Sequence, residues 1–382
     1  MISFEHQLPL SLYIHIPWCV RKCPYCDFNS HQAVSDLPQR EYADALLQDL
    51  ELSMPLIWGR RVSSIFFGGG TPSLFAPEII DHILCGVRAL VAFDPYTEIT
   101  LEANPGTAEA AHFKGYRDAG VNRLSLGIQS FNPQHLRALG RIHDDAEAHW
   151  AVEMALDTFE NVNLDLMYAL PMQTEREALT DIRTAMDYAP QHISAYHLTL
   201  EPNTPFYLAP PPLPDDDASA VMQEALENEL AANGYENYEI SAFARKGWQC
   251  LHNLNYWQFG DYLGIGAGAH GKLTFHDRVI RQARHKHPDA YMREMSAGNP
   301  LSQEQNLTRR DLGFEFMMNT LRLSAGFPVS LFHERTSLTL NMLEKELALA
   351  EIRGLIERDH LQIKPTLLGR RFLNELLQIF LR

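Results

Sequence analysis

The alternation of apolar strand patterns with amphipathic helix patterns constrains the fold of this 382-residue chain more than any other feature. The pair of patterns recurs through the first two hundred or so residues. The predicted strands are residues 10–16, 62–67, 99–103, 123–128, 162–169 and 193–200, and the predicted helices are residues 40–54, 77–91, 108–119, 144–159 and 175–188. Six strands at this density are typical of a parallel βα barrel or part of one, with a doubly wound sheet as the rival fold.

The positions of cysteine, glycine and polar residues decide between the two folds. These residues fall in or just after the predicted strands. Cys19, Cys23 and Cys26 follow the first strand, and a glycine run from Gly68 to Gly70 follows the second. Polar residues of the later strands are Glu102, Gln129, Asp165 and His197. Barrel enzymes build their sites from the C-terminal ends of many strands, whereas a doubly wound sheet concentrates its site at one switch point. We therefore predict an α/β fold with a partial (β/α)6 TIM-like barrel.

The character of the chain changes after residue 200. The segment 201–217 is too rich in proline for a helix or a central strand, and residues 235–271 are rich in aromatic residues and glycine but have poor periodicity. Further helices are predicted at residues 218–233, 311–323, 338–356 and 367–381, with a possible short strand at 361–364. We expect a barrel over residues 1–235, an aromatic and glycine-rich extension over 236–300, and a smaller, mainly helical domain over 301–382 that serves as a lid or partner surface.

Charge and composition restrict the partners and the compartment. The net charge of −16 disfavours nucleic acid and anionic lipid as partners. The N-terminus has no basic region before its short apolar run, and no apolar span reaches membrane length, so we expect a cytoplasmic protein. Cysteines remain thiols in that compartment and serve metal binding or catalysis. Cys85 and Cys250 stand alone and are assigned no role.

The sequence CVRKCPYC places Cys19, Cys23 and Cys26 within eight residues. Three thiolates favour a metal site, because any disulfide would leave one thiol over. They suit a cubane 4Fe-4S cluster held by three of its irons, with the fourth iron free for an exchangeable ligand. A zinc site with His15 or His31 as the fourth ligand is the alternative, although zinc sites usually pair two such knuckles.

This cysteine spacing, with Tyr25 before the last cysteine, resembles the radical S-adenosylmethionine (SAM) superfamily. The flanking segments are more specific, and in order along the chain they resemble the oxygen-independent coproporphyrinogen oxidase family: YIHIPWC, FFGGGTPS, LEANP, RLSLGIQS and NLDLMYALP. The resemblance covers essentially the whole chain. It implies a cluster whose free iron chelates the amino and carboxylate groups of SAM.

The resemblance also assigns residues to SAM. Taken alone, the glycine run is as consistent with a tight turn, and the polar strand residues are as consistent with buried ion pairs. Glycines do let a backbone approach a ligand closely, carboxylates suit ribose hydroxyls and ammonium, and arginine suits a carboxylate. The positions that the resemblance implies are Tyr13, Tyr25, Gly69, Gly70, Thr71, Glu102, Gln129, Arg141 and Asp165.

At three places this sequence differs from the oxidases and instead resembles a heme-chaperone branch of the family. Phe28 replaces a fourth cysteine, only twelve residues precede Tyr13, and HNLNYW is added from His252 to Trp257. The resemblance implies binding of heme and SAM and delivery of heme to membrane or soluble hemoproteins, without the oxidase reaction. A homodimer is a candidate assembly. His252 is the candidate heme-binding residue, because imidazole is a common axial ligand of heme iron; the alternative is a histidine that only caps backbone groups.

Three functions therefore stay open at this point. They are a heme chaperone with a SAM-bound cluster, an oxygen-independent coproporphyrinogen III dehydrogenase, and a zinc-stabilised binding protein. GIGAGAHG at residues 264–271 lacks the βαβ frame of a dinucleotide site, so we interpret it as close backbone packing. A nucleic-acid-binding role for the C-terminal helices is disfavoured by the absence of a basic recognition face in the sequence.

Overall fold

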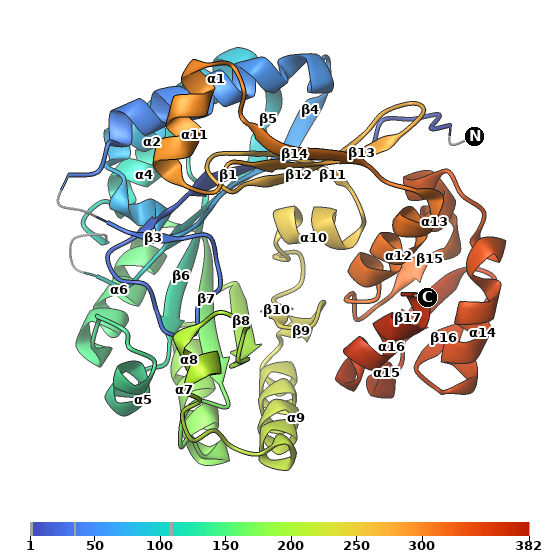
Figure 1. Ribbon diagram of the computed structural model, residues 1–382. Coiled ribbons are helices and arrows are strands. Elements are labelled where there is room, and N and C mark those ends of the chain that lie inside the picture. Colours follow the sequence, from blue (N-terminus) through green and yellow to red (C-terminus); the bar gives the residue numbers. More distant parts are fainter. Residues whose placement is uncertain (1–2, 34–35, 107–109, 382) are drawn as a thin grey trace.

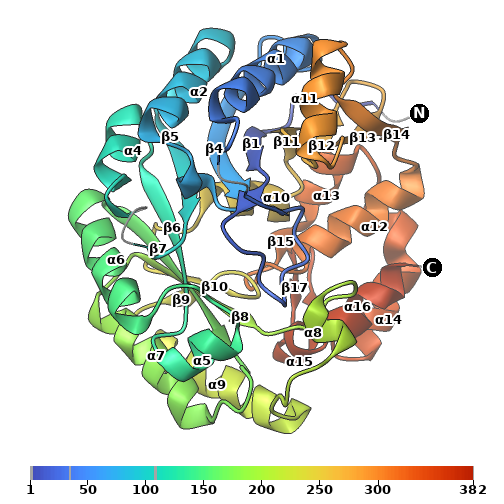
Figure 2. The ribbon, with the colours of Figure 1, turned by 60° about the vertical axis from the view of Figure 1, so that its left-hand side comes forward.

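A parallel sheet with helices on its outer side forms the centre of the protein (Figures 1 and 2). The computed structural model describes residues 3–33, 36–106 and 110–381. Six parallel strands lie in the order β1 (Leu10–Ile16), β4 (Arg61–Gly69), β5 (Ala92–Ala103), β6 (Arg123–Gln129), β7 (Asn161–Tyr168) and β8 (His192–His197). The predicted partial barrel is confirmed, because each of these strands overlaps a predicted one.

Helices connect these strands along the outer face. They are α1 (Gln39–Ile57), α2 (Pro77–Leu90), α4 (Phe113–Ala119), α5 (Pro133–Ala138), α6 (Asp145–Thr158) and α7 (Glu175–Asp187). The beginning of the helix predicted at 108–119 lies outside the described residues. Leu12, Ile14 and Ile16 of β1 are buried in one cluster with Leu46 and Leu50 of α1. The alternating residues of β1 point to the opposite face, inside the barrel.

The sheet continues beyond β1 into the region of poor periodicity, which no strand prediction covered. Strand β11 (Asp261–Ile265) pairs in parallel with β1. Antiparallel strands β12 (His270–Thr274), β13 (Val279–Arg284) and β14 (Leu301–Asn306) follow, so the sheet has twelve strands in the described part of the chain. The short strands β10 (Ala242–Ala244) and β9 (Glu236–Asn237) extend the other edge beside β8. Helices α8 (Pro205–Leu208), α9 (Asp216–Ala232) and α11 (Pro288–Ser296) lie in the connections.

Helix α10 (Leu251–Trp257), which carries the HNLNYW sequence, lies inside the curve of the sheet (Figures 1 and 2). The Glu98 carboxylate on β5 accepts hydrogen bonds from the backbone N–H groups of Leu251 and His252, each at 3.1 Å. The carboxylate thereby satisfies donors at the helix N-terminus that have no partner within the helix. The helix lies toward the N-terminal ends of the strands, away from the cysteine loop, because His252 is hydrogen-bonded to Ser64 in the N-terminal half of β4.

The C-terminal part of the chain is mainly helical, as predicted, but it contains a small sheet. Its helices are α12 (Arg309–Thr320), α13 (Val329–Thr336), α14 (Glu344–Ile352), α15 (Leu367–Arg371) and α16 (Leu373–Phe380). The predicted helix 338–356 was too long: a 3-10 turn (Leu340–Leu343) precedes α14, and strand β16 (Ile356–Arg358) follows it. Strand β17 (Gln362–Pro365) matches the predicted short strand and pairs with both β16 and β15 (Phe327–Pro328).

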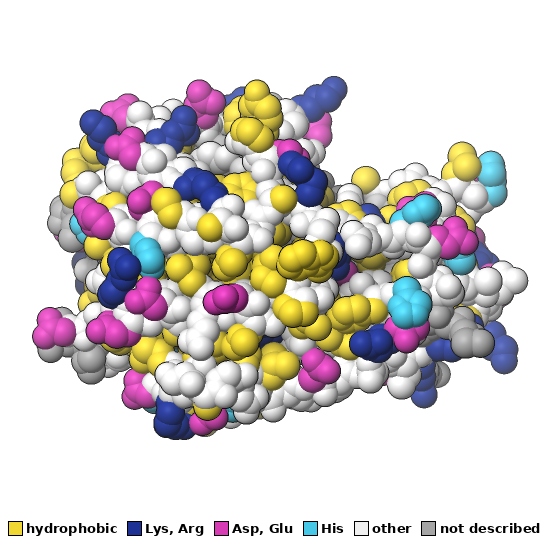
Figure 3. All heavy atoms as spheres, turned by 90° about the horizontal axis from the view of Figure 1, so that it is seen from above, with side chains coloured by type: hydrophobic (Ala, Val, Ile, Leu, Met, Phe, Trp, Pro, Cys, Tyr) yellow, Lys and Arg dark blue, Asp and Glu magenta, His cyan; other side chains and the backbone are white. Residues whose placement is uncertain are grey.

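The surface shows no single-sign patch on the face seen from above, where Lys and Arg side chains are scattered among Asp and Glu (Figure 3). No helix in the described part of the chain is both long enough and apolar enough to cross a membrane.

A buried charge cluster fixes the added strands to the barrel. The Asp261 carboxylate on β11 lies 2.9 Å from the Arg60 guanidinium and 2.9 Å from the Lys272 ammonium, and all three side chains are almost fully buried. It also accepts the backbone N–H and the hydroxyl of Thr274. Burial is the largest single influence on the pKa of Asp261 and by itself would raise it. The two cations and the hydrogen bonds together outweigh burial, so the pKa of Asp261 is lowered. Removing the carboxylate would leave two buried cations without a counter-charge.

We predict that Asp261→Ala lowers the free energy of unfolding by ~3–5 kcal/mol, since truncating one member of a buried ion cluster leaves the other charges uncompensated. Chemical denaturation followed by circular dichroism measures this loss. The matched control is Asp94→Ala, which breaks the exposed pair of Arg61 and Asp94 and should cost less than ~1 kcal/mol. Equal losses in the two variants would contradict the role of the buried cluster.

Candidate functional site

The cysteine loop begins where β1 ends and is tied to the glycine run by backbone hydrogen bonds. Cys19 lies in the two-residue strand β2 (Trp18–Cys19), which pairs with β3 (His31–Gln32). The N–H of Gly70 donates to the carbonyl of Ile16 at 2.8 Å, and the N–H of Thr71 donates to that of Trp18 at 2.7 Å. The loop and the glycines are therefore held as one unit.

All three cysteines of the loop are free and half-buried. Burial is the largest influence on Cys19 and Cys26 and raises the pKa of both thiols. The Arg141 guanidinium donates to the Cys23 sulfur at 3.6 Å, so a cation lies beside the thiols. No group of three or more His, Cys, Asp and Glu side chains within the described residues is arranged to hold a single metal ion. A cubane distributes its three thiolates over three irons, so the thiols need not converge on one point.

The histidines named as zinc candidates are engaged elsewhere. His15 has both ring nitrogens in hydrogen bonds, Nδ1 with the Tyr13 hydroxyl at 3.0 Å and Nε2 with the Asn29 carbonyl at 2.8 Å. Burial lowers the pKa of His15 to about 4, so the ring is neutral at pH 7. His31 Nε2 lies 3.3 Å from the carbonyl of Lys286. His15 therefore has no nitrogen left for zinc, whereas His31 keeps Nδ1, but the described residues contain no group of three or more side chains placed to hold a zinc ion.

The glycine run has no space for side chains. A Cβ atom on Gly69, which has φ +112°, would lie 2.4 Å from the His15 ring. A Cβ atom on Gly70 would lie 2.4 Å from the backbone oxygen of Trp18. These positions therefore require glycine for close packing and, at Gly69, for the backbone conformation as well. Thr71 is buried next to them, and its hydroxyl accepts a hydrogen bond from the Asn104 side chain at 2.9 Å.

Two carboxyl groups, Glu102 and Asp165, lie inside the barrel above α10. The Gly69 N–H donates to Glu102 Oε2 at 3.2 Å. Asp165 accepts from the Ser125 hydroxyl at 2.8 Å and from the Asn163 amide at 2.9 Å. Burial and then the neighbouring charge of Asp165 raise the pKa of Glu102 to about 8, and burial also raises the pKa of Asp165. No salt bridge to either group is formed in the described residues, although the charge of the buried Arg123 opposes the rise in both pKa values.

Arg141 reaches the same region from the loop after α5. Its Nη2 donates to Asn104 Oδ1 at 2.6 Å and to the Gly127 carbonyl at 2.8 Å. Its Nε is buried and has no hydrogen-bond partner among the described residues. Gln129 ends β6 with φ 69°, close to Gly127. Asn104 was not predicted, although it belongs to the quoted segment LEANP.

A cavity of about 680 Å³ opens beside these residues. Three predicted residues line it, namely Tyr13, Gly69 and Glu102. Tyr256 of the HNLNYW sequence and Phe28 also line it, together with residues that the sequence interpretation did not select, among them Tyr262, His270 and Lys286. Tyr25 lies away from this cavity in a small apolar cluster with Phe206, with ring centroids 6.3 Å apart. Residues 22–31 supply the largest share of the cavity wall, and the added strands β11 and β12 contribute Tyr262 and His270.

His252 lies beneath the cavity and is not part of its wall. Its Nδ1 lies 3.0 Å from the Ser64 hydroxyl and its Nε2 3.2 Å from the Tyr256 hydroxyl, while its ring stacks on Phe66. The side chain is buried, and burial lowers its pKa to about 3. To ligate heme iron, the ring would have to give up one of these two bonds. Its hydrogen bond to Tyr256 does connect it to the cavity wall.

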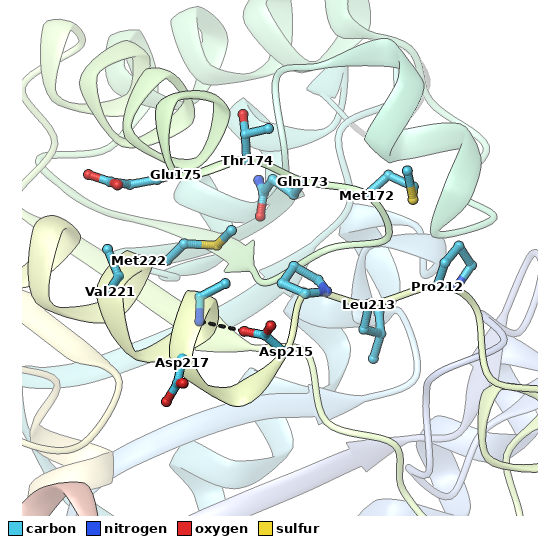
Figure 4. A pocket seen from close by; sticks show the side chains of 12 residues that line it. Met172, Gln173, Thr174, Glu175, Pro212, Leu213, Asp215, Asp217, Val221 and Met222 are labelled. Atoms are coloured by element: carbon cyan, nitrogen blue, oxygen red, sulfur yellow. Dashed lines mark hydrogen bonds between the residues drawn. The ribbon is translucent and has the colours of Figure 1, made fainter.

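A second cavity, of about 550 Å³, lies between the first turns of α7 and α9 (Figure 4). Met172, Leu213, Val221 and Met222 give it an apolar lining, and Asp215 caps α9 at its edge. No predicted site residue lines it. It lies apart from the cysteine loop and is not part of the candidate site.

Comparison with known proteins gives the family. The Radical SAM superfamily model matches residues 13–185, and the HemN C-terminal domain model matches residues 307–372. A protein of Haemophilus influenzae named "Heme chaperone HemW" is 50% identical over 98% of each chain. The chain belongs to the HemW family of radical SAM proteins. The Escherichia coli and Bacillus subtilis proteins of the same name are 48% and 35% identical over nearly their full lengths.

The solved structure of coproporphyrinogen III oxidase (HemN) from E. coli is also similar. It has a TM-score of 0.83 and 25% sequence identity, and the match covers 98% of this chain and 90% of that chain. Membership of the radical SAM family implies a 4Fe-4S cluster and SAM. Three soft thiol donors on one loop, with a cation beside Cys23 and glycines packed against that loop, fit such a cluster.

The pKa of Glu102 provides a test of the carboxyl pair. We predict that Glu102 in the cluster-free protein titrates near pH 8 and that Asp165→Asn lowers its pKa, because one of the two causes of the shift is removed while burial remains. Infrared pH titration of the carboxyl band, assigned with Glu102→Gln, measures both values. Asp94→Asn, an exposed substitution, is the control. A Glu102 pKa that does not change in Asp165→Asn would contradict the coupling.

Proposed function

We propose that this protein is a heme chaperone that holds a SAM-ligated 4Fe-4S cluster, binds heme beside it and transfers heme to acceptor hemoproteins. The observation that carries this proposal is the relationship to proteins named heme chaperones at up to 50% identity over nearly the whole chain. The large cavity next to the cysteine loop supports it, because heme needs an extensive, partly apolar cavity.

In this proposal Cys19, Cys23 and Cys26 hold the cluster. A bound cluster supplies an open iron that chelates SAM. The Arg141 guanidinium donates to the Cys23 sulfur at 3.6 Å, so a positive charge lies beside one of the three thiols. Since burial raises the pKa of the other two thiols, iron must compete with protons at Cys19 and Cys26.

The proposed SAM site uses the residues around the glycine run. Gly69, Gly70 and Thr71 present backbone to the ligand, and Tyr13 and Tyr25 pack or hydrogen-bond at its borders. Glu102, Gln129, Arg141 and Asp165 provide polar groups. A carboxyl group such as Glu102, whose pKa is raised by burial, ionises more readily when a cationic ligand group binds beside it.

His252 has a positioning role in this proposal. Its bond to Tyr256 holds that tyrosine in the cavity wall, and its bond to Ser64 anchors α10 to β4. The residue would thus help to bind heme through Tyr256. His252→Ala is expected to weaken hemin binding while leaving the position of the heme Soret band unchanged, since the iron ligands stay the same.

The oxidase reaction is the second candidate, favoured by the similarity to the E. coli HemN structure. The relatives named heme chaperones are more similar in sequence. Phe28 occupies the position of the fourth cysteine of the oxidases, and its side chain is exposed and lines the cavity. The two functions differ in what leaves the protein, namely hemin or a decarboxylated porphyrinogen.

The function is tested by anaerobic hemin transfer. We expect the reconstituted protein to bind hemin and transfer it to an apo-cytochrome b acceptor, followed by the acceptor's Soret spectrum. The protein should yield no protoporphyrinogen from coproporphyrinogen with SAM and reductant. Protoporphyrinogen formation without hemin transfer would establish the oxidase function instead, and failure to bind hemin would refute the chaperone proposal.

The SAM site is tested by Gly69→Ala. We expect SAM affinity to fall by at least about tenfold, because the methyl group would collide with His15 and displace the backbone from the ligand. Equilibrium dialysis with labelled SAM measures the affinity, and iron content checks the cluster. Gly59→Ala is the matched control: Gly59 also has positive φ, but its Cβ would meet nothing within 4 Å. Normal SAM binding by Gly69→Ala would contradict the assignment.

A further inference from the structure

The outer part of the large cavity contains residues that the proposed cluster and SAM sites do not use. These residues come from three separate segments: Lys22 and Phe28 from the cysteine loop, Tyr262 and His270 from β11 and β12, and Lys286 after β13. Glu102 and Gly69 form the opposite, inner part, next to the glycine run. The cavity is therefore divided between two groups of residues with different chemistry.

His270 differs from the other histidines of the cavity in having both ring nitrogens free. His15 uses both nitrogens, and His31 uses Nε2. The His270 side chain forms no hydrogen bond or ion pair within the described residues, and it is exposed in the cavity wall. Partial burial and then the charge of Lys286 lower the pKa of His270, which keeps the ring neutral at pH 7. A neutral imidazole with a free ring nitrogen is the form that binds iron.

Two cations lie near this histidine without carboxylate partners. Lys22 donates to the backbone carbonyls of Phe28 and Ser30 at 3.0 and 3.5 Å, and Lys286 forms no ion pair in the part of the chain that the structure describes. A chain with net charge −16 has carboxylates in excess, so two unpaired lysines on one cavity are informative. The cavity wall contains two acidic residues. Asp27 belongs to the cysteine loop, as Lys22 does, whereas Glu102 lies in the inner part of the cavity and has a pKa raised to about 8.

Aromatic rings supply apolar surface between these polar groups. Tyr256 and Tyr262 meet edge to face with ring centroids 4.4 Å apart, and both line the cavity. The Phe28 side chain is 59% exposed, which is unusual for an aromatic ring beside a cavity. Exposed aromatic surface of this kind suits a flat macrocycle.

We propose that the outer part of the cavity is the heme site, with His270 as an axial ligand of the iron and Lys22 and Lys286 as partners of the two propionates. This inference rests on the proposed heme-chaperone function and specifies where heme binds. The iron ligand comes from β12, a strand that the barrel predicted from the sequence did not include. Heme and SAM then occupy adjacent parts of one cavity.

The experiment is hemin titration of the reconstituted holoprotein and its variants, followed by the Soret band. His270→Ala should raise the hemin dissociation constant on the order of tenfold and shift the Soret band, because one iron–imidazole bond is lost. Added imidazole should restore the wild-type Soret position. Lys286→Glu should weaken hemin binding more than Lys286→Arg, since only the former reverses the charge at the propionate.

His276→Ala is the matched control, because the His276 side chain is 85% exposed and lies on the turn between β12 and β13, outside the cavity. Iron content and SAM binding should be unchanged in His270→Ala, which shows that the fold and cluster are intact. Wild-type affinity and Soret position in His270→Ala would overturn this heme site. A Soret shift in His252→Ala but not in His270→Ala would overturn it in favour of the buried histidine. Failure of the wild-type protein to bind hemin would refute the chaperone function itself, so the two failures are distinguishable.

Discussion

The parallel pairing of β1 with a strand on each side is the constraint on which the site depends. On one side, the pairing with β4 places Ile16 opposite Gly69 and brings the cysteine loop to the glycine run. On the other side, the pairing with β11 aligns Tyr13 with Gly264, next to the turn that leads to His270. A strand at the edge of the sheet could not bring both groups together. The cluster loop and the outer cavity are thus joined through a single buried strand.

The interior of the barrel is arranged in layers of increasing burial. The cysteine loop lies at the C-terminal ends of the strands, Glu102 and Gly69 lie next to it, and Tyr256 and His252 lie below. In the deepest layer Glu98 caps the N-terminus of α10. Buried side-chain atoms without a hydrogen-bond partner among the described residues occur at several depths, and they include Trp257 Nε1 on α10 and Arg141 Nε beside the cysteine loop. In the cavity wall, the His270 ring also has no partner within the described residues.

The sequence allowed the six parallel strands to be predicted, because each is a short apolar run bounded by amphipathic helices. It did not allow β11 to be predicted. Gly264 and Gly266 interrupt the apolar pattern there, and the structure shows why glycine is needed: added Cβ atoms would lie 2.0 Å from the His270 carbonyl oxygen and 2.5 Å from the His15 carbonyl oxygen. The same sequence was correctly interpreted as close backbone packing, but not as a strand. Tertiary packing overrode the local pattern.

The site could be predicted in part. Cys19, Cys23 and Cys26 are candidates from their spacing alone, whereas Gly69 is a candidate only through the family resemblance. The proximity of the cysteine loop and Gly69 follows from the order of the strands. The surroundings of His252 could not be predicted, since its partner Ser64 lies 188 positions away in the sequence. The surroundings of His270 could not be predicted either, since the residues near it in the cavity wall come from three separate segments of the chain.

The central claim is that heme binds in the cavity beside the loop that holds the cluster. Pulsed electron paramagnetic resonance of the reduced holoprotein loaded with hemin measures it most directly, because two paramagnetic centres in neighbouring sites relax each other through magnetic dipolar coupling. The account predicts faster relaxation of the cluster signal when hemin is bound, and loss of this effect in His270→Ala. Stoichiometric hemin binding without any change in cluster relaxation would place heme elsewhere and contradict the account.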